Sequence, residues 1–353
     1  MNPKIVIDRA KLRHNAETLS AYLTENGLQY HFVTKVVCAH PEITQILAEA
    51  GIRHFADSRV ENLQALKDIA ESRMLLRMPM ISEAGTVVES ADLSLNSEID
   101  TINALSDAAV ARGLDKHGVI LMVELGDLRE GILPEDVMDI AHQVLNLRGV
   151  RLAGIGVNFN CYGGVIPTAD KMKQLAEIAE TIERRFNIKL DYISGGNSGS
   201  LHLIDKGEIP EKVNHLRIGE ALFLGNETSY GHRVLDLHQD VFRLEAEVIE
   251  NKRKASVPDG EIGKNFAGET PVFEDRGNIR RVILAIGRQD VDFDQIVPQR
   301  KNIDLLGSSS DHAIYDITNS NIELAIGDTV AFDVTYASLM RLFTSKYVHK
   351  ELV

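Results

Sequence analysis

Lys35 is the residue of this chain whose position best suits covalent chemistry. It closes the segment Tyr30–Lys35, which has the pattern of a short apolar strand. A lysine at such a strand end is partly desolvated, and this makes its amine a usable nucleophile toward aldehydes and a usable base. Alone the observation is weak, because most strand-end lysines are solvated surface groups.

Two glycine-rich segments far downstream have the composition of a phosphate-binding site. The segment 194–200 reads Ser-Gly-Gly-Asn-Ser-Gly-Ser, and 217–221 reads Arg-Ile-Gly-Glu-Ala. Such loops bind phosphate through exposed backbone N–H groups and a helix N-terminus. A lysine combined with a phosphate cradle suggests pyridoxal phosphate. The alternative for the first segment is a plain strand-to-helix turn in which Ser198 caps the helix.

Two arginines each allow a functional and a structural interpretation. Arg217, at a strand end, suits a hydrogen bond to a pyridine nitrogen, whereas a lone arginine more commonly lies on the surface or in an ion pair. Arg129 suits a substrate carboxylate, because its planar guanidinium can donate two parallel hydrogen bonds. The alternative for Arg129 is an ion pair with Glu130 or Asp127 on a helix surface.

Composition restricts the class of protein. The chain has 353 residues, 44% hydrophobic and 25% charged, as in ordinary globular proteins of one or two domains. A net charge of −14 argues against nucleic-acid binding, which needs Lys and Arg against phosphates. Two cysteines and no signal-peptide or membrane-spanning run indicate a cytoplasmic protein without membrane partners. Its histidines and cysteines form no metal-binding pattern, so we expect no metal.

The first two thirds of the chain alternate short apolar runs with helical periodicity. After a helix at 9–26, strands are predicted at 29–35, 53–56, 73–77, 92–95, 118–124, 151–157, 190–194 and 213–218. Helices are predicted between them at 41–50, 59–70, 83–90, 98–112, 134–147, 167–186 and 198–206. Eight such units predict a closed (β/α)8 TIM-type barrel, with an open doubly wound sheet as the alternative.

A barrel would bring the candidate residues together. Active sites of such barrels lie at the carboxyl ends of the strands, often with phosphate bound after strands seven and eight. The Ser194 loop follows the predicted strand seven, Arg217 ends strand eight, and Lys35 ends strand one, their neighbour in a closed ring.

The last third of the chain has a different pattern. Runs at 241–250, 280–286, 313–317 and 328–334 are short, β-branched or alternating, and separated by turn residues. The segment 251–275 is polar and predicts an extended loop or hairpin. We therefore expect two domains. They are a barrel at 9–230 and a β-rich C-terminal domain at 231–353, to which the N-terminal strand within 1–8 is added.

Several phrases resemble one enzyme family. They are Val33–Cys38 (Val-Thr-Lys-Val-Val-Cys), Asp57–Asn62 (Asp-Ser-Arg-Val-Glu-Asn), Ile286–Val291 (Ile-Gly-Arg-Gln-Asp-Val) and Gly307–His312 (Gly-Ser-Ser-Ser-Asp-His), the last followed by Tyr315–Thr318. With Lys35, Arg129, the two glycine-rich segments and the β-rich domain, they resemble the alanine/ornithine racemase family within the alanine racemase superfamily of fold-type III pyridoxal-phosphate enzymes. The resemblance runs from residue 4 to about 350.

The resemblance implies a role for each matching residue. Lys35 matches the lysine that binds the cofactor covalently and then acts as one of two α-proton bases, and Arg217 matches the arginine on the pyridine nitrogen. Arg129 matches the arginine near the substrate carboxylate. Asp311 matches a substrate-side residue from the partner subunit, which implies a homodimer with shared active sites. The residues that match phosphate-binding positions are Ser194, Gly195, Gly196, Gly219, Glu220 and Tyr336.

This chain departs from the alanine racemase pattern at three positions. Arg288 stands where the tyrosine that serves as the second base is found. Arginine is a poor base, so either Arg288 is tuned for the task or Asp311, Ser309 or Ser310 takes its place. Met122 aligns with a lysine that is carbamylated in many alanine racemases, and Asn158 aligns with a cofactor-side histidine near Arg217.

The resemblance implies a pyridoxal-phosphate-dependent amino-acid racemase. A basic substrate, ornithine or lysine, is compatible with Asp290, Asp292 and Asp311, which could pair with a terminal amine. The alternatives are a fold-type III decarboxylase, which usually carries a Cys-Glu pair in the C-terminal domain, and a non-catalytic pyridoxal-phosphate-binding protein, which lacks that domain. Cys38 and Cys161 both lie in the predicted barrel, and this disfavours the decarboxylase.

Overall fold

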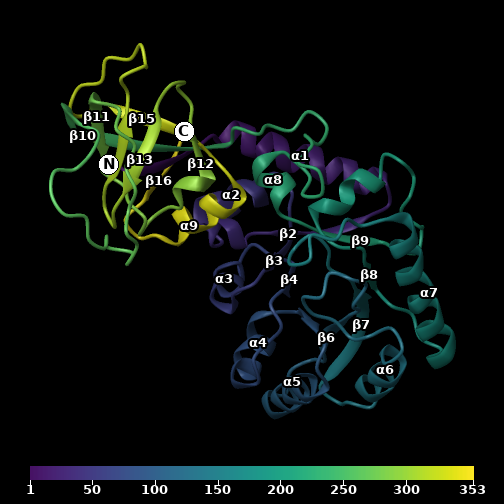
Figure 1. Cartoon of the computed structure of the whole chain (residues 1–353). Coiled ribbons are helices and arrows are strands. Elements are labelled where there is room, and N and C mark those ends of the chain that lie inside the picture. The colour runs from purple at the N-terminus through teal and green to yellow at the C-terminus, as the bar shows by residue number, and fades with distance from the viewer. The chain divides into compact units, whose positions relative to one another are not determined.

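The computed structural model describes residues 1–353 and divides into two compact units (Figure 1). One unit contains Ala10–Gln239, and the other joins Met1–Arg9 to Asp240–Val353. The chain therefore starts in the second unit, passes into the first at Arg9, and returns after Gln239.

The first unit is a closed barrel of eight parallel strands, which confirms the predicted (β/α)8 fold and excludes the open sheet. The strands in ring order are β2 (Gln29–Val33), β3 (His54–Asp57), β4 (Ser72–Leu75), β5 (Leu93–Asn96), β6 (His117–Met122), β7 (Val150–Gly156), β8 (Tyr192–Ser194) and β9 (His215–Ile218). The ring closes where β9 pairs with β2. β5 and β6 are buried along their whole lengths, as expected of parallel strands covered by helices.

Helices follow most strands, as the periodicity predicted. They are α1 (Arg9–Glu25), α2 (Pro41–Glu49), α3 (Val60–Ala65), α4 (Ala84–Ser90), α5 (Ile99–Arg112), α6 (Val137–Leu145), α7 (Ala169–Phe186) and α8 (Glu220–Leu224), with 3-10 turns η1 (Lys35–Val37), η2 (Ile81–Glu83) and η3 (Ser198–Leu203). The helix predicted at 198–206 is the 3-10 turn η3, because glycine and serine dominate its first turn. α3 is shorter than predicted.

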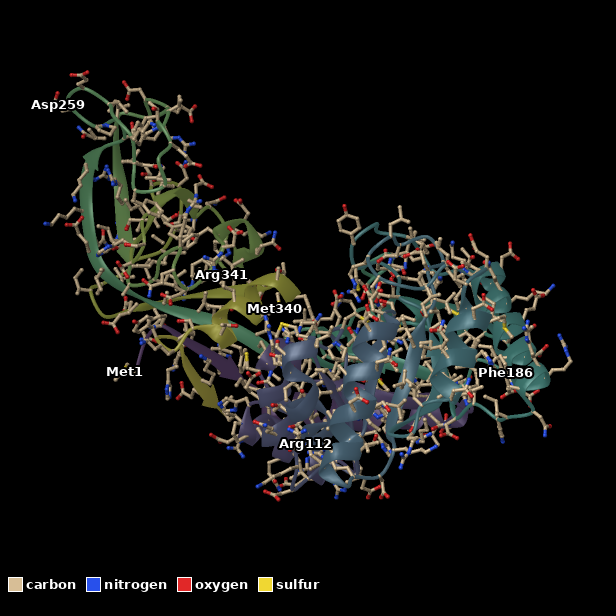
Figure 2. All side chains as sticks on the ribbon, turned by 90° about the horizontal axis from the view of Figure 1, so that it is seen from below. Met1, Arg112, Phe186, Asp259, Met340 and Arg341 are labelled. Carbon is tan, nitrogen blue, oxygen red and sulfur yellow. The ribbon has the colours of Figure 1, made fainter.

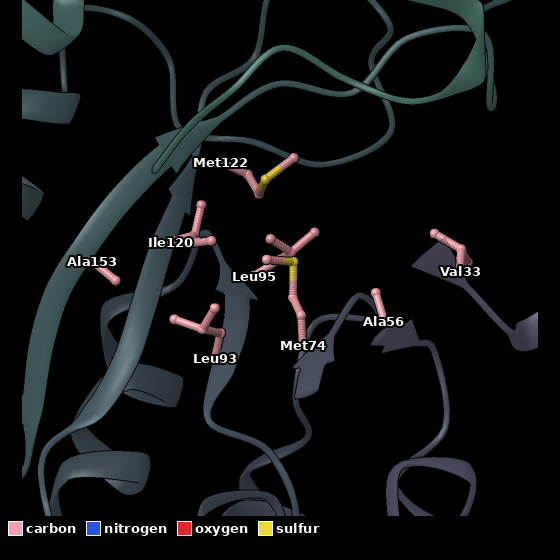
Figure 3. Packing of buried hydrophobic residues seen from close by; sticks show 8 residues of the cluster. All are labelled: Val33, Ala56, Met74, Leu93, Leu95, Ile120, Met122 and Ala153. Carbon is pink, nitrogen blue, oxygen red and sulfur yellow. The ribbon is translucent and has the colours of Figure 1, made fainter. Parts of the chain in front are cut away.

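Apolar side chains from six neighbouring strands fill part of the barrel. Figure 3 shows them pointing toward one another: Val33, Ala56, Met74, Leu93, Leu95, Ile120, Met122 and Ala153. Gly154 permits close strand packing beside this cluster, because a Cβ there would lie 2.0 Å from the carbonyl oxygen of Tyr192.

The second unit is built on an eight-stranded, largely antiparallel sheet. Its elements are β1 (Lys4–Ile7), β10 (Phe242–Ala255), β11 (Asn278–Leu284), η4 (Phe293–Gln295), β12 (Ile296–Pro298), β13 (Asp304–Ser308), β14 (Ala313–Asp316), β15 (Thr329–Val334), α9 (Tyr336–Thr344) and β16 (His349–Leu352). The strand order is β12-β15-β10-β11-β14-β13, and β1 pairs with both β10 and β16.

The sequence prediction was incomplete in this unit. The segment 251–275, expected to be an extended loop or hairpin, connects the antiparallel strands β10 and β11, and β10 continues into it as far as Ala255 through a register shift between Val248 and Glu250. Asp259 lies at the outer end of the loop that remains (Figure 2). The prediction also omitted β12, β13, β16 and α9. None of the helices has the length and apolar composition needed to cross a membrane.

The barrel cluster gives a direct test of the packing. Leu95→Ala should lower the free energy of unfolding by about 2–5 kcal/mol, because it leaves a cavity among close-packed side chains. Leu114→Ala, at a side chain that is 42% exposed, should change it by less than about 0.5 kcal/mol. Urea unfolding of both variants measures the difference, and equal losses would contradict the packing described here.

Candidate active site

Barrel closure determines the position of the two residues best suited to chemistry. In the β2–β9 pairing, His31 lies opposite Arg217 and Phe32 opposite Ile218. Beyond the strand ends, a Cβ on Gly219 would lie 3.2 Å from the Cβ of Val33, two residues before Lys35. The segments carrying Lys35 and Gly219 therefore leave the barrel side by side, at the carboxyl ends of their strands.

The segment that carries Lys35 is held from the neighbouring strand. The backbone N–H of Thr34 donates to the carbonyl of Ala56 at 2.9 Å, and its hydroxyl donates to Asp57 Oδ2 at 2.7 Å. Asp57 also accepts hydrogen bonds from the Arg59 N–H and the Asn62 amide, each at 3.0 Å. Burial raises the pKa of the Asp57 carboxyl, and these donors oppose the rise. This buried carboxylate fixes the turn from which Lys35 projects.

Arg217 is a buried cation whose hydrogen-bond partners are neutral. Its side chain is 5% exposed, and it donates to Ser194 Oγ at 2.5 Å and to the Val157 carbonyl at 2.8 Å. Burial lowers its pKa to about 10, so the guanidinium stays charged at neutral pH. A buried charge without a hydrogen-bonded counter-charge costs free energy unless another group supplies an acceptor. A ligand atom with a lone pair meets this requirement.

Ser198, which the sequence suggested only as a helix cap, contacts the backbone that follows β9. Its Oγ is buried and accepts from the N–H groups of Gly219 at 3.3 Å and Ala221 at 3.2 Å. Asn197 takes the capping role and accepts from the Gly199 N–H at 2.8 Å. The hydroxyl of Ser198 and the amides of Gly219 and Ala221 therefore lie together just beyond the end of β9.

Ser194 has surroundings different from those the sequence indicated. Its buried hydroxyl contacts Arg217 and, at 2.8 Å, His215 Nδ1, so it supports the arginine. Serines separated by four residues in one loop cannot be distinguished by composition. The signal that identifies Ser198 is its contact with the backbone after β9, which only the fold reveals.

The glycines of the loop are required by close packing. Gly196 has φ +109°, which favours glycine, and a Cβ there would lie 2.8 Å from Ser200 Oγ. A Cβ on Gly195 would lie 2.6 Å from Val213 Cγ1. The side chain of Glu220 is engaged elsewhere, because its carboxylate accepts from Asn226 and Thr228 at 2.8 Å each. Only the backbone of Glu220 belongs to the turn after β9.

Arg129 forms the ion pair with Glu130 that the sequence left open. Both Nε and Nη2 donate to the Glu130 carboxylate, whose side chain is 13% exposed. This contact raises the pKa of Arg129. Nearby, Asn158 donates to Asp127 Oδ2 at 3.0 Å and is buried. The pairing leaves Nη1 of Arg129 as the part of its guanidinium not engaged by Glu130.

The predicted residues of the second unit form a group of their own. Arg288 donates from Nε to Ser308 Oγ at 2.9 Å and from its backbone to the Ser309 carbonyl at 2.9 Å. Ser310 donates to Asp311 Oδ2 at 2.6 Å, and both side chains are exposed at the β13–β14 turn. The structure therefore brings Arg288, Ser309, Ser310 and Asp311 together.

Two further residues of this unit have defined surroundings. Tyr336 is half-buried and begins α9, directly after the capping residue Thr335. Asp290 is 7% exposed and accepts from Ser345 Oγ at 2.6 Å. This buried position gives Asp290 a structural contact and does not fit the suggested binding of a substrate amine.

One cavity lies at the opposite end of the barrel. It has a volume of about 390 Å³ and is lined by the first residues of several strands, among them Gln29, His54 and Tyr192. Active sites of these barrels lie at the carboxyl ends, so the cavity is not the candidate active site. No group of three His, Cys, Asp or Glu side chains is arranged to hold a metal.

Comparison with known proteins identifies the family. Residues 7–227 match the model of the alanine racemase N-terminal domain. The ornithine racemase of Acetoanaerobium sticklandii is 44% identical over 100% of both chains, and the lysine racemase of Thermotoga maritima is 37% identical over 99% of this chain and 98% of that one. The chain belongs to the alanine racemase family, as its motifs suggested.

Solved structures agree on the fold. Alanine racemase from Bartonella henselae, solved with covalently bound pyridoxal phosphate, superposes with a TM-score of 0.74 at 17% identity over 100% of both chains. D-threonine aldolase from Filomicrobium marinum superposes with a TM-score of 0.71 at 14% identity, over 97% of this chain and 89% of that one. Both share the barrel and β-rich architecture.

Buried histidines of the barrel predict how its stability depends on pH. Burial lowers the pKa of His31 to about 3, that of His117 to about 4, and that of His215 well below its ordinary value of 6.5. Below pH 6.5 the unfolded chain binds more protons than the folded barrel. Stability should therefore fall by up to about 1.4 kcal/mol per pH unit for each histidine between pH 6.5 and 5.

Urea unfolding of the protein without ligand, at intervals from pH 7.5 to 5, measures this slope. His117→Gln should reduce it by about one histidine's share. A free energy of unfolding that stays flat across this range would show that the three histidines are not buried in the neutral form.

Proposed function

We propose that this chain is a pyridoxal-phosphate-dependent racemase of basic amino acids, with ornithine as the first candidate substrate and lysine as the second. The observation that carries the proposal is the buried Arg217, with neutral partners only, placed by barrel closure beside the strand that ends at Lys35. The names of two relatives, ornithine racemase and lysine racemase, support the substrate class.

The residues present fit pyridoxal phosphate. Lys35 would hold the aldehyde carbon, and Arg217 would donate to the ring nitrogen. The Ser198 hydroxyl and the amides from Gly219 to Ala221 would bind the phosphate, with Tyr336 as a further donor. When bound, the cofactor would supply the electron sink that makes an amino acid's α-proton acidic.

The chain itself must then move protons on two faces of the substrate. Lys35 would take or return the α-proton on one face. On the other face we propose Asp311, with Ser310 as the hydroxyl that already donates to it at 2.6 Å. Arg288 has donors only, so its role would be to hold the Ser308–Ser309 turn beside Asp311.

Arg129 would bind the substrate carboxylate. Its Nε and Nη2 donate to Glu130 and so fix the plane of the guanidinium. Nη1 would donate to the substrate carboxylate. The Glu130 carboxylate would thereby orient Arg129, as a carbamylated lysine at the position of Met122 would do. Asp311, exposed at its turn, could also pair with a terminal amine.

We further propose that the active enzyme is a homodimer in which Asp311 of one copy serves the Lys35 site of the other. The proposal rests on the family resemblance of the turn 307–312.

Racemisation is the direct test of the function. The cofactor-loaded protein should invert L- or D-ornithine, and lysine more slowly, with one solvent deuteron incorporated at the α-carbon per inversion. Lys35→Ala should abolish both, because it removes the cofactor attachment and one base. Polarimetry and mass spectrometry in D₂O measure the two quantities, and carbon dioxide is followed in parallel.

Release of carbon dioxide without inversion would replace the racemase with a decarboxylase. No reaction on ornithine, lysine, arginine, alanine or serine, despite a Lys35-dependent absorbance band, would indicate a cofactor-binding protein without this activity.

The phosphate cradle makes a separate prediction. Ser198→Ala should weaken the binding of pyridoxal phosphate by roughly tenfold, because a hydrogen bond to a charged group is lost. Binding of pyridoxal, which lacks the phosphate, should be unchanged. Ser90→Ala, at a buried serine that accepts from Gln64, serves as the matched control and should alter neither affinity. Equal losses for both ligands would place Ser198 away from the phosphate.

A further inference from the structure

Four polar side chains connect Arg217 to the far end of the barrel. Arg217 Nη1 contacts Ser194 Oγ at 2.5 Å, and Ser194 Oγ contacts His215 Nδ1 at 2.8 Å. His215 Nε2 lies 2.8 Å from His31 Nδ1, and His31 Nε2 lies 3.0 Å from Ser72 Oγ. The chain runs between β9, β8, β2 and β4, and both histidines are at most 2% exposed.

The chemistry of arginine fixes the direction of the first link. A guanidinium only donates, so Ser194 Oγ accepts from Arg217. We assign the Ser194 hydroxyl as the donor to His215 Nδ1, which lies at 2.8 Å, because this gives the buried hydroxyl an acceptor. His215 then carries its proton on Nε2 and donates to His31 Nδ1. His31 likewise carries its proton on Nε2 and donates to Ser72. Any protonated histidine in the chain would place two N–H groups against each other or leave the Ser194 hydroxyl without an acceptor.

The groups around the two rings favour this neutral arrangement. His54 lies 5.6 Å from His31 between ring centroids, and Tyr192 lies 6.0 Å from His31 and 5.2 Å from His215. Desolvation is the largest cause that lowers the pKa of each histidine, and the charges of His54 and Arg217 act in the same direction. Neither ring has a carboxylate among these neighbours.

We propose that His31 and His215 are positioning residues that hold Arg217 through Ser194. The inference rests on the proposed function, because the guanidinium so oriented is the donor to the cofactor's ring nitrogen. With Nη1 on Ser194 and Nη2 on the Val157 carbonyl, the plane of the guanidinium is fixed. The neutral histidines hold Ser194 as an acceptor without adding a second positive charge beside Arg217.

The protonation states can be measured without any cofactor. In protein with ¹⁵N-labelled histidine, long-range ¹H–¹⁵N spectra should show His31 and His215 as neutral Nε2–H tautomers at pH 7 and still at pH 5. The two signals are assigned by their loss in His31→Asn and His215→Asn. A cationic imidazole, or an Nδ1–H tautomer at either histidine, would contradict the proposed chain of hydrogen bonds.

The positioning role is tested by variants of His215. His215→Leu should weaken pyridoxal phosphate binding roughly tenfold and shift the absorbance band of the Lys35-bound cofactor, because Ser194 loses its acceptor. His215→Asn keeps an acceptor near Nδ1 and should stay within about threefold of wild type. The matched control is His117→Leu, because His117 is buried in the same barrel and contacts Ser94 and Ala91 instead.

The outcomes separate the two proposals. Equal effects of His215→Leu and His117→Leu, or none for His215→Leu, would leave His215 with a structural role only. If His215→Leu does not fold, His31→Leu is compared with His117→Leu by the absorbance band of the Lys35-bound cofactor, and a shift in His31→Leu alone supports the positioning role. If the wild-type protein shows no Lys35-dependent absorbance band, the proposed function fails. The histidine tautomers seen in the ¹H–¹⁵N spectra then still test the hydrogen-bond chain from Arg217 to Ser72.

Discussion

Closure of the barrel between β9 and β2 is the constraint on which the rest of the site depends. Arg217 and Lys35 are 182 positions apart in the numbering, and only this pairing brings their strands together. Because parallel strands align their carboxyl ends, one register sets the level of the Gly219 amides, the Ser198 hydroxyl and the Lys35 turn. A slip of one residue would turn Arg217 out of the interior.

This closure divides the barrel interior into two kinds of surface. Strands β2 to β7 contribute apolar side chains that pack closely. Around the closing strands, His31, His215, Ser194 and Arg217 form hydrogen bonds in sequence. A buried polar group is tolerable only when it has a partner. The interior cation Arg217 therefore has two neutral acceptors, Ser194 Oγ and the Val157 carbonyl.

Much of the barrel could be predicted from the sequence, since each strand is an apolar run followed by a helical period. Lys35 and Arg217 could be selected because strand ends are where such folds place chemistry. Ser198 could not be distinguished from Ser194, because the difference lies in their contacts: Ser194 accepts from Arg217 in β9, whereas Ser198 accepts from the backbone after β9. β16 was missed because His349–Leu352 is polar and becomes a strand only through pairing with β1. The 3-10 turn η3 replaced a helix because its small residues pack tightly.

The pairing of β1 has a consequence for how the chain is made. β1 precedes the barrel segment in the chain, whereas its partners, β10 and β16, follow it. The complete barrel segment is synthesised while Lys4–Ile7 has no strand beside it. The order of synthesis and the order of assembly therefore differ: β1 can pair with β10 and β16 only after the whole barrel segment between them has been made. Long-range pairing of this kind is slow.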